Sequence, residues 1–272
     1  MLRQNKALIS KQDQIIVYLE SIQQILQTYQ SISLKEMDGV ALMNRTDTKY
    51  IISKEELLDV LKEVSGHYRI LDINGVRNNH YRSQYYDTPD FYFYKRHHSG
   101  KKNRLKIRKR LYVESNLTFL EVKFKSNKGR TEKDRMKLVE LNADLTEDNL
   151  HYISETSHFE ELIEPKLLNS FERITLVDQS LPERITIDLD LGFEMDGRVL
   201  SIPDLVIIEA KQERQNRHSV FLSALKKRLI RPESISKYCL GVALMTTEKS
   251  NMFKEKIRRI NKITNGNYQY NN

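Results

Sequence analysis

Four short stretches of the chain alternate charged and apolar residues, so that an extended strand would carry their charges on one side. They are 104–110 (RLKIRKR), 121–125 (EVKFK), 184–190 (RITIDLD) and 209–211 (EAK). Residues two apart in a strand point the same way, which places four cations on one face of the first stretch: Arg104, Lys106, Arg108 and Arg110. These cations repel one another unless anions offset them. A bound polyanion would do so.

A solvated outer face is the commoner explanation for charge alternation on any single strand. Four such stretches weaken that explanation. A solvated face also mixes charges of both signs, whereas 104–110 contains no acidic residue. We therefore consider a buried or half-buried charged face as well.

The composition favours an anionic partner. The 272 residues include 45 Lys and Arg against 37 Asp and Glu, a formal net charge of +8. This excess does not discriminate among nucleic acid, lipid headgroups and phosphate metabolites. With 39% hydrophobic residues the chain fits a soluble protein with one main domain, predicted at 36–248. An amphipathic helical extension is predicted at 1–35, and a basic helix with a frayed tail at 249–272.

The cysteine count and the hydropathy of the chain indicate the cellular compartment in which the protein is expected. Cys239 is the only cysteine, which excludes an intrachain disulfide and indicates a reducing compartment, with the cytoplasm as the default. No stretch approaches the ~18 apolar residues that span a bilayer. We expect membrane association only through a partner.

Turn residues separate the expected strands more often than crossover helices do, so the sheet should be mostly antiparallel. Ser53 and Glu56 form a capping box that predicts a helix to about Val64. Helices are also expected over 146–168, 218–229 and 253–263, and a hairpin turn over 195–197.

In a closed or nearly closed barrel the charged strand faces would meet in one lumen, where many cations surround a few carboxylates. Arg and Lys bind nonbridging phosphate oxygens. Glu121 and Glu209 fit such a site if a divalent cation lies between them and the phosphates. Asp188 and Asp190 are either lumen carboxylates or ion-pair partners.

Several common motifs of nucleotide-binding and metal sites are absent from the sequence. The sequence has no P-loop and no Gly-rich dinucleotide fingerprint. His97 and His98 lack further ligands at metal spacing, which favours surface histidines. The tyrosines of 81–94 fit core packing better than base stacking, and we expect no nucleic-acid partner.

The chain resembles the VTC domain, the polyphosphate polymerase branch of the triphosphate tunnel metalloenzymes, a CYTH-like superfamily. The resemblance spans about Asp38 to Met245 and rests on ordered pieces: DTKYIIS, YRSQYYDTPDFYFY, NRLKIRKR, FLEVKFK with GRTEKDR, FERI, RITIDLDL, VIIEAK and SISKYCLG. It implies an α+β fold built on a mostly antiparallel eight-stranded β-barrel, a triphosphate tunnel with flanking helices. It also implies ATP and polyphosphate as ligands, with Mn²⁺ or Mg²⁺.

The resemblance assigns roles to individual residues. The implied catalytic residues are Lys49, Arg108, Arg110, Lys123, Arg173 and Arg184. The candidate phosphate-binding residues are Lys106, Lys133, Lys211, Ser236 and Lys237, and the candidate metal ligands are Glu209 and Glu121. The superfamily's E-x-E-x-K signature is replaced here by Arg45-Thr46-Asp47-Thr48-Lys49, a departure that argues against a CYTH-type triphosphatase.

These inferences favour a metal-dependent polyphosphate polymerase that transfers the γ-phosphoryl group of ATP to a growing chain. Residue types alone leave three alternatives open. They are a triphosphatase on the same fold, a non-catalytic polyphosphate or nucleotide-binding module, and an RNA-binding protein.

Overall fold

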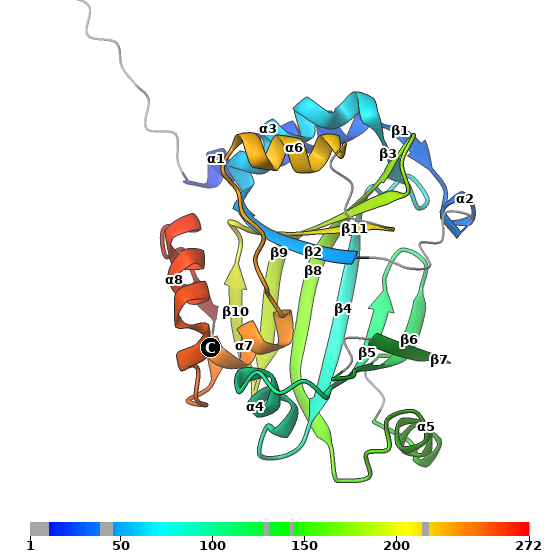
Figure 1. Cartoon of the computed structure of the whole chain (residues 1–272). Helices are drawn as coiled ribbons and strands as arrows, with labels where there is room; N and C mark the ends of the chain where they lie inside the picture. The colour runs from blue at the N-terminus through cyan, green and yellow to red at the C-terminus, as the bar shows by residue number, and fades with distance from the viewer. Residues whose placement is uncertain (1–10, 39–45, 128–130, 142–143, 214–217, 272) are drawn as a thin grey trace, which may run out of the picture.

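A computed structural model shows the chain folded around one large sheet with helices on both of its faces (Figure 1). The structure describes residues 11–38, 46–127, 131–141, 144–213 and 218–271. Within these ranges the strands are β1 (Gln30–Ile32), β2 (Thr46–Ser53), β3 (Tyr68–Leu71), β4 (Asn78–Asp87), β5 (Arg104–Tyr112), β6 (Leu117–Lys125), β7 (Thr131–Leu138), β8 (Glu164–Asp178), β9 (Glu183–Met195), β10 (Arg198–Ile202), β11 (Leu205–Gln212) and β12 (Gln269–Asn271). The helices are α1 (Lys11–Gln27), α2 (Leu34–Asp38), α3 (Lys54–Val64), α4 (Tyr92–His98), α5 (Glu147–Ser157), α6 (Val220–Lys227), α7 (Lys237–Met245) and α8 (Lys254–Ile263), with 3₁₀ turns η1 (Ser65–His67) and η2 (Asn251–Phe253).

Eight strands follow one another across the sheet in the order β2–β11–β9–β8–β4–β5–β6–β7, and each neighbouring pair is antiparallel. The predicted α+β fold with a mostly antiparallel sheet is therefore confirmed. The predicted closure into a barrel is wrong: among the described residues β2 pairs only with β11, and β7 only with β6. The other edge of β2 bonds a loop instead of a strand: the backbone N–H of Glu233 donates to the Lys49 carbonyl at 2.7 Å.

The two longest strands allow the sheet to bend. β9 pairs with β11 along its first half and with β10 along its second half, while β8 pairs with β4 along most of its length and with β3 at its C-terminal end. The β8–β9 ladder shifts register between Ser170 and Glu172, and Asp190 on β9 has a φ of 49°. Such irregularities increase local twist and redirect side chains. Asp188 and Asp190 consequently have separate surroundings, and Asp190 pairs with Lys54 at the start of α3 (Nζ–Oδ1 2.6 Å).

Helices α1, α3 and α6 cover the outer face of β2, β11, β9 and β8 (Figure 1). The predicted capping box of α3 is present, with the Ser53 side chain accepting from the Glu56 N–H and the Glu56 side chain accepting from the Ser53 N–H. Leu57, Leu61 and other apolar residues of α3 are fully buried. α1 packs on this layer, and the Tyr29 hydroxyl that follows it donates to the Leu61 carbonyl at 2.6 Å.

The inner face of the sheet is covered at one end by α7 and α8. α7 approaches β8 and β9 closely at Gly241, where a Cβ would lie 2.5 Å from Leu167 Cδ2 and 2.7 Å from Phe193 Cδ1. Any larger residue would therefore push the helix away from the sheet. This close approach brings Lys237, the first residue of α7, to the inner face.

Three local expectations differ from the structure. The helix predicted over 146–168 ends at Ser157, where His158 adopts a left-handed conformation (φ 53°), and β8 begins at Glu164. The tail predicted to be frayed forms β12, which pairs with β10. His98 is buried rather than on the surface, and His97 is half-buried with its Nδ1 3.1 Å from the Cys239 Sγ.

Some expectations are not tested by the structure. Arg45 of the signature, and Gly129 and Arg130 of GRTEKDR, lie outside the described residues. The boundaries of the predicted domain and its two extensions stay predictions. Within the described ranges, every helix is too short or too polar to cross a membrane.

Candidate functional site

One inner wall is formed by β5, β6 and β7 and is rich in cations, most of which form no ion pair with another described residue. The register sets Arg108 opposite Glu121 and Lys106 opposite Lys123, which is itself opposite Lys133. Because strand residues alternate, one face collects Arg104, Lys106, Arg108, Arg110, Glu121, Lys123, Lys125, Lys133, Arg135 and Lys137. The other face packs apolar residues such as Ile107 against α5. We call the charged face of these three strands the basic wall.

Glu121 is the carboxylate of the basic wall and lies between two cations. Arg108 donates to Glu121 Oε2 through Nε at 2.7 Å and contacts it through Nη2 at 2.6 Å, and the Lys133 Nζ lies 2.7 Å from Oε1. Burial alone would raise the pKa of Glu121, but the two cations hold it well below its usual range. Both oxygens are thus engaged by cations, and the role of Glu121 as a metal ligand stays a prediction that these contacts weigh against.

Arg110 is held on the same wall by a hydroxyl and by aromatic rings. Its Nε donates to the Ser83 Oγ of β4 at 2.9 Å. Its guanidinium lies 5.6 Å from the ring centres of both Tyr81 and Phe171. Ring faces stabilise a cation without neutralising it, so Arg110 retains its charge for an anionic ligand.

Tyr85 of β4 is buried beside the basic wall. Arg108 Nη1 donates to its hydroxyl at 3.3 Å, and the Lys106 Nζ lies 5.9 Å from its ring centre. Burial alone would raise the pKa of Tyr85, but Arg108, Lys106, Arg110 and Lys237 lower it to about 7. A phenol with such a pKa reports a strongly positive local potential.

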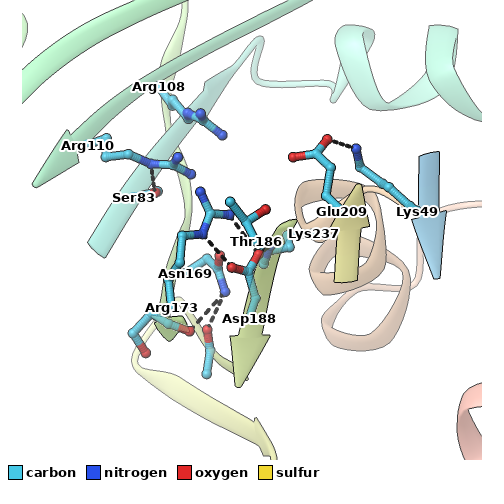
Figure 2. A network of polar contacts seen from close by, with 12 residues as sticks. Lys49, Ser83, Arg108, Arg110, Asn169, Arg173, Thr186, Asp188, Glu209 and Lys237 are labelled. Carbon is cyan, nitrogen blue, oxygen red and sulfur yellow. Dashed lines mark hydrogen bonds and ion pairs between the residues drawn. The ribbon is translucent and has the colours of Figure 1, made fainter. Parts of the chain in front are cut away.

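The opposite inner wall, formed by β8, β9, β11 and β2 with Lys237 of α7, keeps its charges in pairs. Arg173 binds Asp188 through two parallel bonds, Nε–Oδ1 at 2.6 Å and Nη2–Oδ2 at 2.8 Å, and Lys237 contacts the same Oδ2 (Figure 2). Burial alone would raise the pKa of Asp188, but these two cations hold it well below its usual range. We call this face the paired wall.

Glu209 of β11 repeats this arrangement one strand away. Its Oε1 pairs with Lys49 of β2, and its Oε2 lies 2.6 Å from the Lys211 Nζ. The two lysines lower the pKa of Glu209 well below its usual range against the effect of burial. Burial in turn lowers the pKa of Lys211 to about 8, although Glu209 opposes the shift. Arg110 and Arg173 both lie over the rings of Tyr81 and Phe171. In Figure 2 the Glu209–Lys49 pair lies across a space from Arg108 and Arg110, and Arg173 and Asp188 lie between these two groups. We call the side chains around this space the charged interior.

The two walls meet near the start of α7. The Lys106 Nζ is 3.5 Å from the Ser236 Oγ, which also accepts from the Cys239 N–H and caps α7. Lys123 lies at the exposed rim, where partial burial and the neighbouring Lys106 lower its pKa to about 8. Each of these groups offers a hydrogen-bond donor to an anion.

The structure thus brings most of the residues predicted for the site onto two facing walls. Arg184 is half-buried, shares a strand face with Thr186 and Asp188, and lies opposite Lys211 in the register. Their individual roles stay predictions. The tyrosine-rich segment is confirmed as core, with Tyr81, Tyr85 and Tyr94 buried in one cluster.

Three interior residues were not singled out from the sequence: Asn79, Ser83 and Tyr85, all on the inward face of β4. Asn79 is 2% exposed, and neither polar atom of its side chain has a partner among the described residues. It lies opposite Arg173 in the register. The alternation in NNHYRSQYY is the signal that could have found them, because it places all three on one strand face.

A divalent metal fits this interior only in part. Among the described residues no three His, Cys, Asp or Glu side chains group together as a ready-made metal cluster. Mg²⁺ sites commonly use one or two carboxylates and complete the shell with substrate phosphates and water. Both oxygens of Glu209 are held by lysines, as those of Glu121 are by cations, but the Glu209 side chain is more exposed (19% against 2%). Asp47, on the same face of β2 as Lys49, faces Lys211 in the register, so Glu209 fits this pattern once its two lysines turn to phosphate.

Comparison with solved structures finds distant similarity. An adenylyl cyclase candidate from Hippeastrum, described as having a dominant triphosphatase activity, has 12% identity and a TM-score of 0.45 over 76% of this chain and 98% of its own. An adenylate cyclase candidate from Vibrio parahaemolyticus has 13% identity and a TM-score of 0.43 over 74% of this chain and 99% of its own. The PH1819 protein of Pyrococcus horikoshii has 15% identity and a TM-score of 0.38 over 73% and 98%. At these TM-scores the likeness carries no inference about activity.

Comparison with curated proteins finds no match. The comparison with family models does find one, and it agrees with the resemblance drawn from the ordered sequence motifs. The VTC domain model matches residues 44–246, which include every strand from β2 to β11 and the helix that carries Lys237. The chain belongs to the VTC domain family.

Proposed function

We propose that this protein is a metal-dependent polyphosphate polymerase that transfers the γ-phosphoryl group of ATP to a growing polyphosphate chain in the charged interior. The observation that carries this proposal is the excess of cations on the basic wall. Nine lysines and arginines share its face with one carboxylate, Glu121. A row of like charges at this spacing is unfavourable without a counter-charge, and a phosphate chain supplies one charge per phosphate.

The paired wall supplies donors that would hold the reacting phosphates in place. Lys49 and Lys211 already hold a carboxylate oxygen each on Glu209, and their ammonium groups can turn to phosphate oxygens when a polyanion enters. Arg173 presents a planar guanidinium fixed by Asp188, which restricts the directions of its remaining donors. Binding of this kind orients the donor and acceptor phosphates relative to each other.

Glu209, with Asp47 beside it, would hold the metal, for which Mn²⁺ and Mg²⁺ are the candidates. A bound divalent ion neutralises charge that develops on the transferred phosphoryl group and the departing diphosphate. Phosphoryl transfer needs little covalent help from the protein, and the acceptor phosphate is already anionic at neutral pH. The lysines and arginines of both walls therefore contribute by positioning and by electrostatic stabilisation.

Water in place of the acceptor phosphate would convert the same interior into a triphosphatase. To decide, purified protein is incubated with ATP and Mn²⁺ or Mg²⁺, and the products are resolved by length. We expect chains of many phosphates together with ADP. ADP with free phosphate alone would indicate the hydrolase, and no turnover would indicate a binding module.

The metal assignment has its own test. Glu209→Gln removes the carboxylate charge while preserving size, and we expect it to abolish turnover while tripolyphosphate still binds. Glu194→Gln, an exposed position on the same sheet, is the matched control and should retain full activity. Full activity of Glu209→Gln would contradict the assignment.

The proposal also covers the cellular location of the protein and the class of its ligand. A cytoplasmic location, inferred from the single cysteine, and a phosphate ligand rather than nucleic acid, inferred from the arrangement of cations, both stay predictions.

A further inference from the structure

A second basic site lies beside the charged interior, at the free edge of β2. It is a hollow of about 360 Å³ between the start of α3, the end of α6 and α8. Its lining includes Ile51, Glu56, Arg228, Leu229, Arg259 and Lys262. We call it the edge groove. None of the residues predicted for the phosphate site lines it.

Three cations and one acid line the edge groove, and two of these cations also pair with acids just outside it. Arg228 Nη1 lies 2.7 Å from Glu63 Oε2, and Arg259 Nη1 lies 3.4 Å from Glu233 Oε2. Lys262 is exposed and makes no ion pair with another described residue. The carboxylate of Glu56, the acid in the lining, accepts from the Ser53 N–H and belongs to the helix cap. The same segments carry further exposed cations: Lys226, Arg231, Lys254 and Arg258.

A single segment separates the edge groove from the charged interior. Residues 229–236, which we call the strap, run from α6 across β2 to α7 (Figure 1). The Glu233 N–H of the strap bonds the Lys49 carbonyl, and its last residue, Ser236, contacts Lys106. Ile51 lines the groove and lies two residues beyond Lys49 on the same strand face. A flexible chain leaving the interior at Lys49 therefore meets the groove directly across the strap.

We propose that the edge groove is an outer subsite for polyphosphate, which holds phosphates of a chain too long for the charged interior. This inference rests on the proposed function for the identity of the chain. The lining cations come from two segments, Arg228 from the end of α6 and Arg259 and Lys262 from α8, rather than from one point. Such a surface suits a linear polyanion, which gains from many weak contacts and releases counterions as it binds.

Comparing the binding of long and short polyphosphates tests the outer subsite. Leu229 is 86% exposed at the rim of the groove, so Leu229→Glu adds a negative charge there without loss of core packing. We expect this variant to bind a chain of about 100 phosphates roughly fivefold more weakly, because like charges repel across the groove. Its affinity for tripolyphosphate should stay within about twofold, because the shorter ligand is held by the interior. Met252→Glu, an exposed apolar residue outside the groove, is the matched control and should bind both ligands as the wild type does.

A second variant removes cations from the groove itself. Arg259→Gln with Lys262→Gln should weaken long-chain binding about tenfold and reduce the slope of log Kd against log salt by about two. Equal weakening for both chain lengths, or no effect on the long chain, would overturn the outer subsite while leaving the proposed function standing. Failure of the wild type to bind either length would overturn both. Vesicles with anionic lipid form a further arm: groove-dependent binding to vesicles but not to long polyphosphate would also contradict the inference.

Discussion

The two walls of the charged interior use similar residues for different purposes. On the paired wall each carboxylate lies between two cations, as Asp188 does between Arg173 and Lys237, so each of these four cations has a carboxylate partner. On the basic wall Glu121 engages Arg108 and Lys133, and the remaining cations make no ion pair with a carboxylate of the residues that the structure describes. Under the proposed function, a polyanion supplies the partners that the basic wall lacks, whereas the paired wall already gives each of those four cations a carboxylate.

The largest effect should come from removing cations of the basic wall. Lys106→Gln with Lys123→Gln deletes two opposed ammonium groups, and charge-assisted hydrogen bonds of this kind contribute roughly 1.5 kcal/mol or more each. We expect the affinity for tripolyphosphate, measured by calorimetry, to fall about 100-fold. Lys101→Gln with Lys102→Gln, two exposed residues just before β5, should change it by less than about twofold. Equal losses in both double variants would mean that net charge, and not the wall, governs binding.

Removing a carboxylate from the paired wall should lower the stability of the folded protein. Asp188→Asn leaves Arg173 and Lys237 facing each other without their shared anion. We expect the free energy of unfolding to fall by roughly 2 kcal/mol, less than for fully buried pairs because both cations retain some water. Saturating tripolyphosphate should restore part of this loss in thermal denaturation, since phosphate replaces the carboxylate. An unchanged melting temperature would show that the pair contributes nothing.

The same carboxylate gives a pH dependence with a definite sign. The pKa of Asp188 in the folded protein lies well below its usual range, so its contribution to stability is complete above about pH 4 and declines as the pH falls further. Acid denaturation of the wild type and of Asp188→Asn should therefore converge at low pH. Parallel curves down to pH 2 would contradict this.

Ligand affinity should decline at alkaline pH on both walls. The pKa values of Lys123 and Lys211 are lowered to about 8, so each is charged at pH 7 and about nine-tenths neutral at pH 9. Phosphate binding favours the charged forms, and the affinity for tripolyphosphate should fall about tenfold between pH 7.5 and 9.5. Proton uptake on binding near pH 8.5, measured in buffers of different ionisation enthalpy, is the direct check. Pure proton release would contradict the assignment.

The smallest effect concerns Tyr85 at the junction of the walls. Its pKa of about 7 predicts a tyrosinate absorbance near 295 nm that appears around neutral pH and disappears in Tyr85→Phe. Because an anionic phenolate repels phosphate, Tyr85→Phe should bind tripolyphosphate about threefold more tightly at pH 8. Tyr112→Phe, on the neighbouring strand, is the control and should retain the signal.

Local patterns in the sequence predicted part of this arrangement. Period-two alternation identified the charged face of β5, and the Ser53–Glu56 spacing identified the start of α3. Asp188 could not be assigned, since its partner Arg173 lies on another strand and the pairing depends on a register that a bulge shifts. Residues 164–168, the start of β8, lie in the predicted helix because their pattern is compatible with both structures.

The sequence also could not predict that β2 and β7 stay unpaired with each other in the described part of the sheet. Nothing local to β2 or β7 shows that the edge of β2 bonds the strap at Glu233 instead of another strand. Likewise, the alternation that placed cations on the basic wall could not show which of them lack a carboxylate partner. Both properties arise from contacts between residues distant in the chain.

The central claim is that a phosphate chain lies between the two walls. A crystal structure of the protein with tripolyphosphate and Mn²⁺ tests it most directly, since the anomalous signal of manganese marks the metal. We expect the phosphate oxygens within hydrogen-bond distance of Lys106, Arg108 and Arg110, with manganese beside Glu209. Phosphates bound only on the outer surface, with Arg173 and the basic wall untouched, would contradict the account.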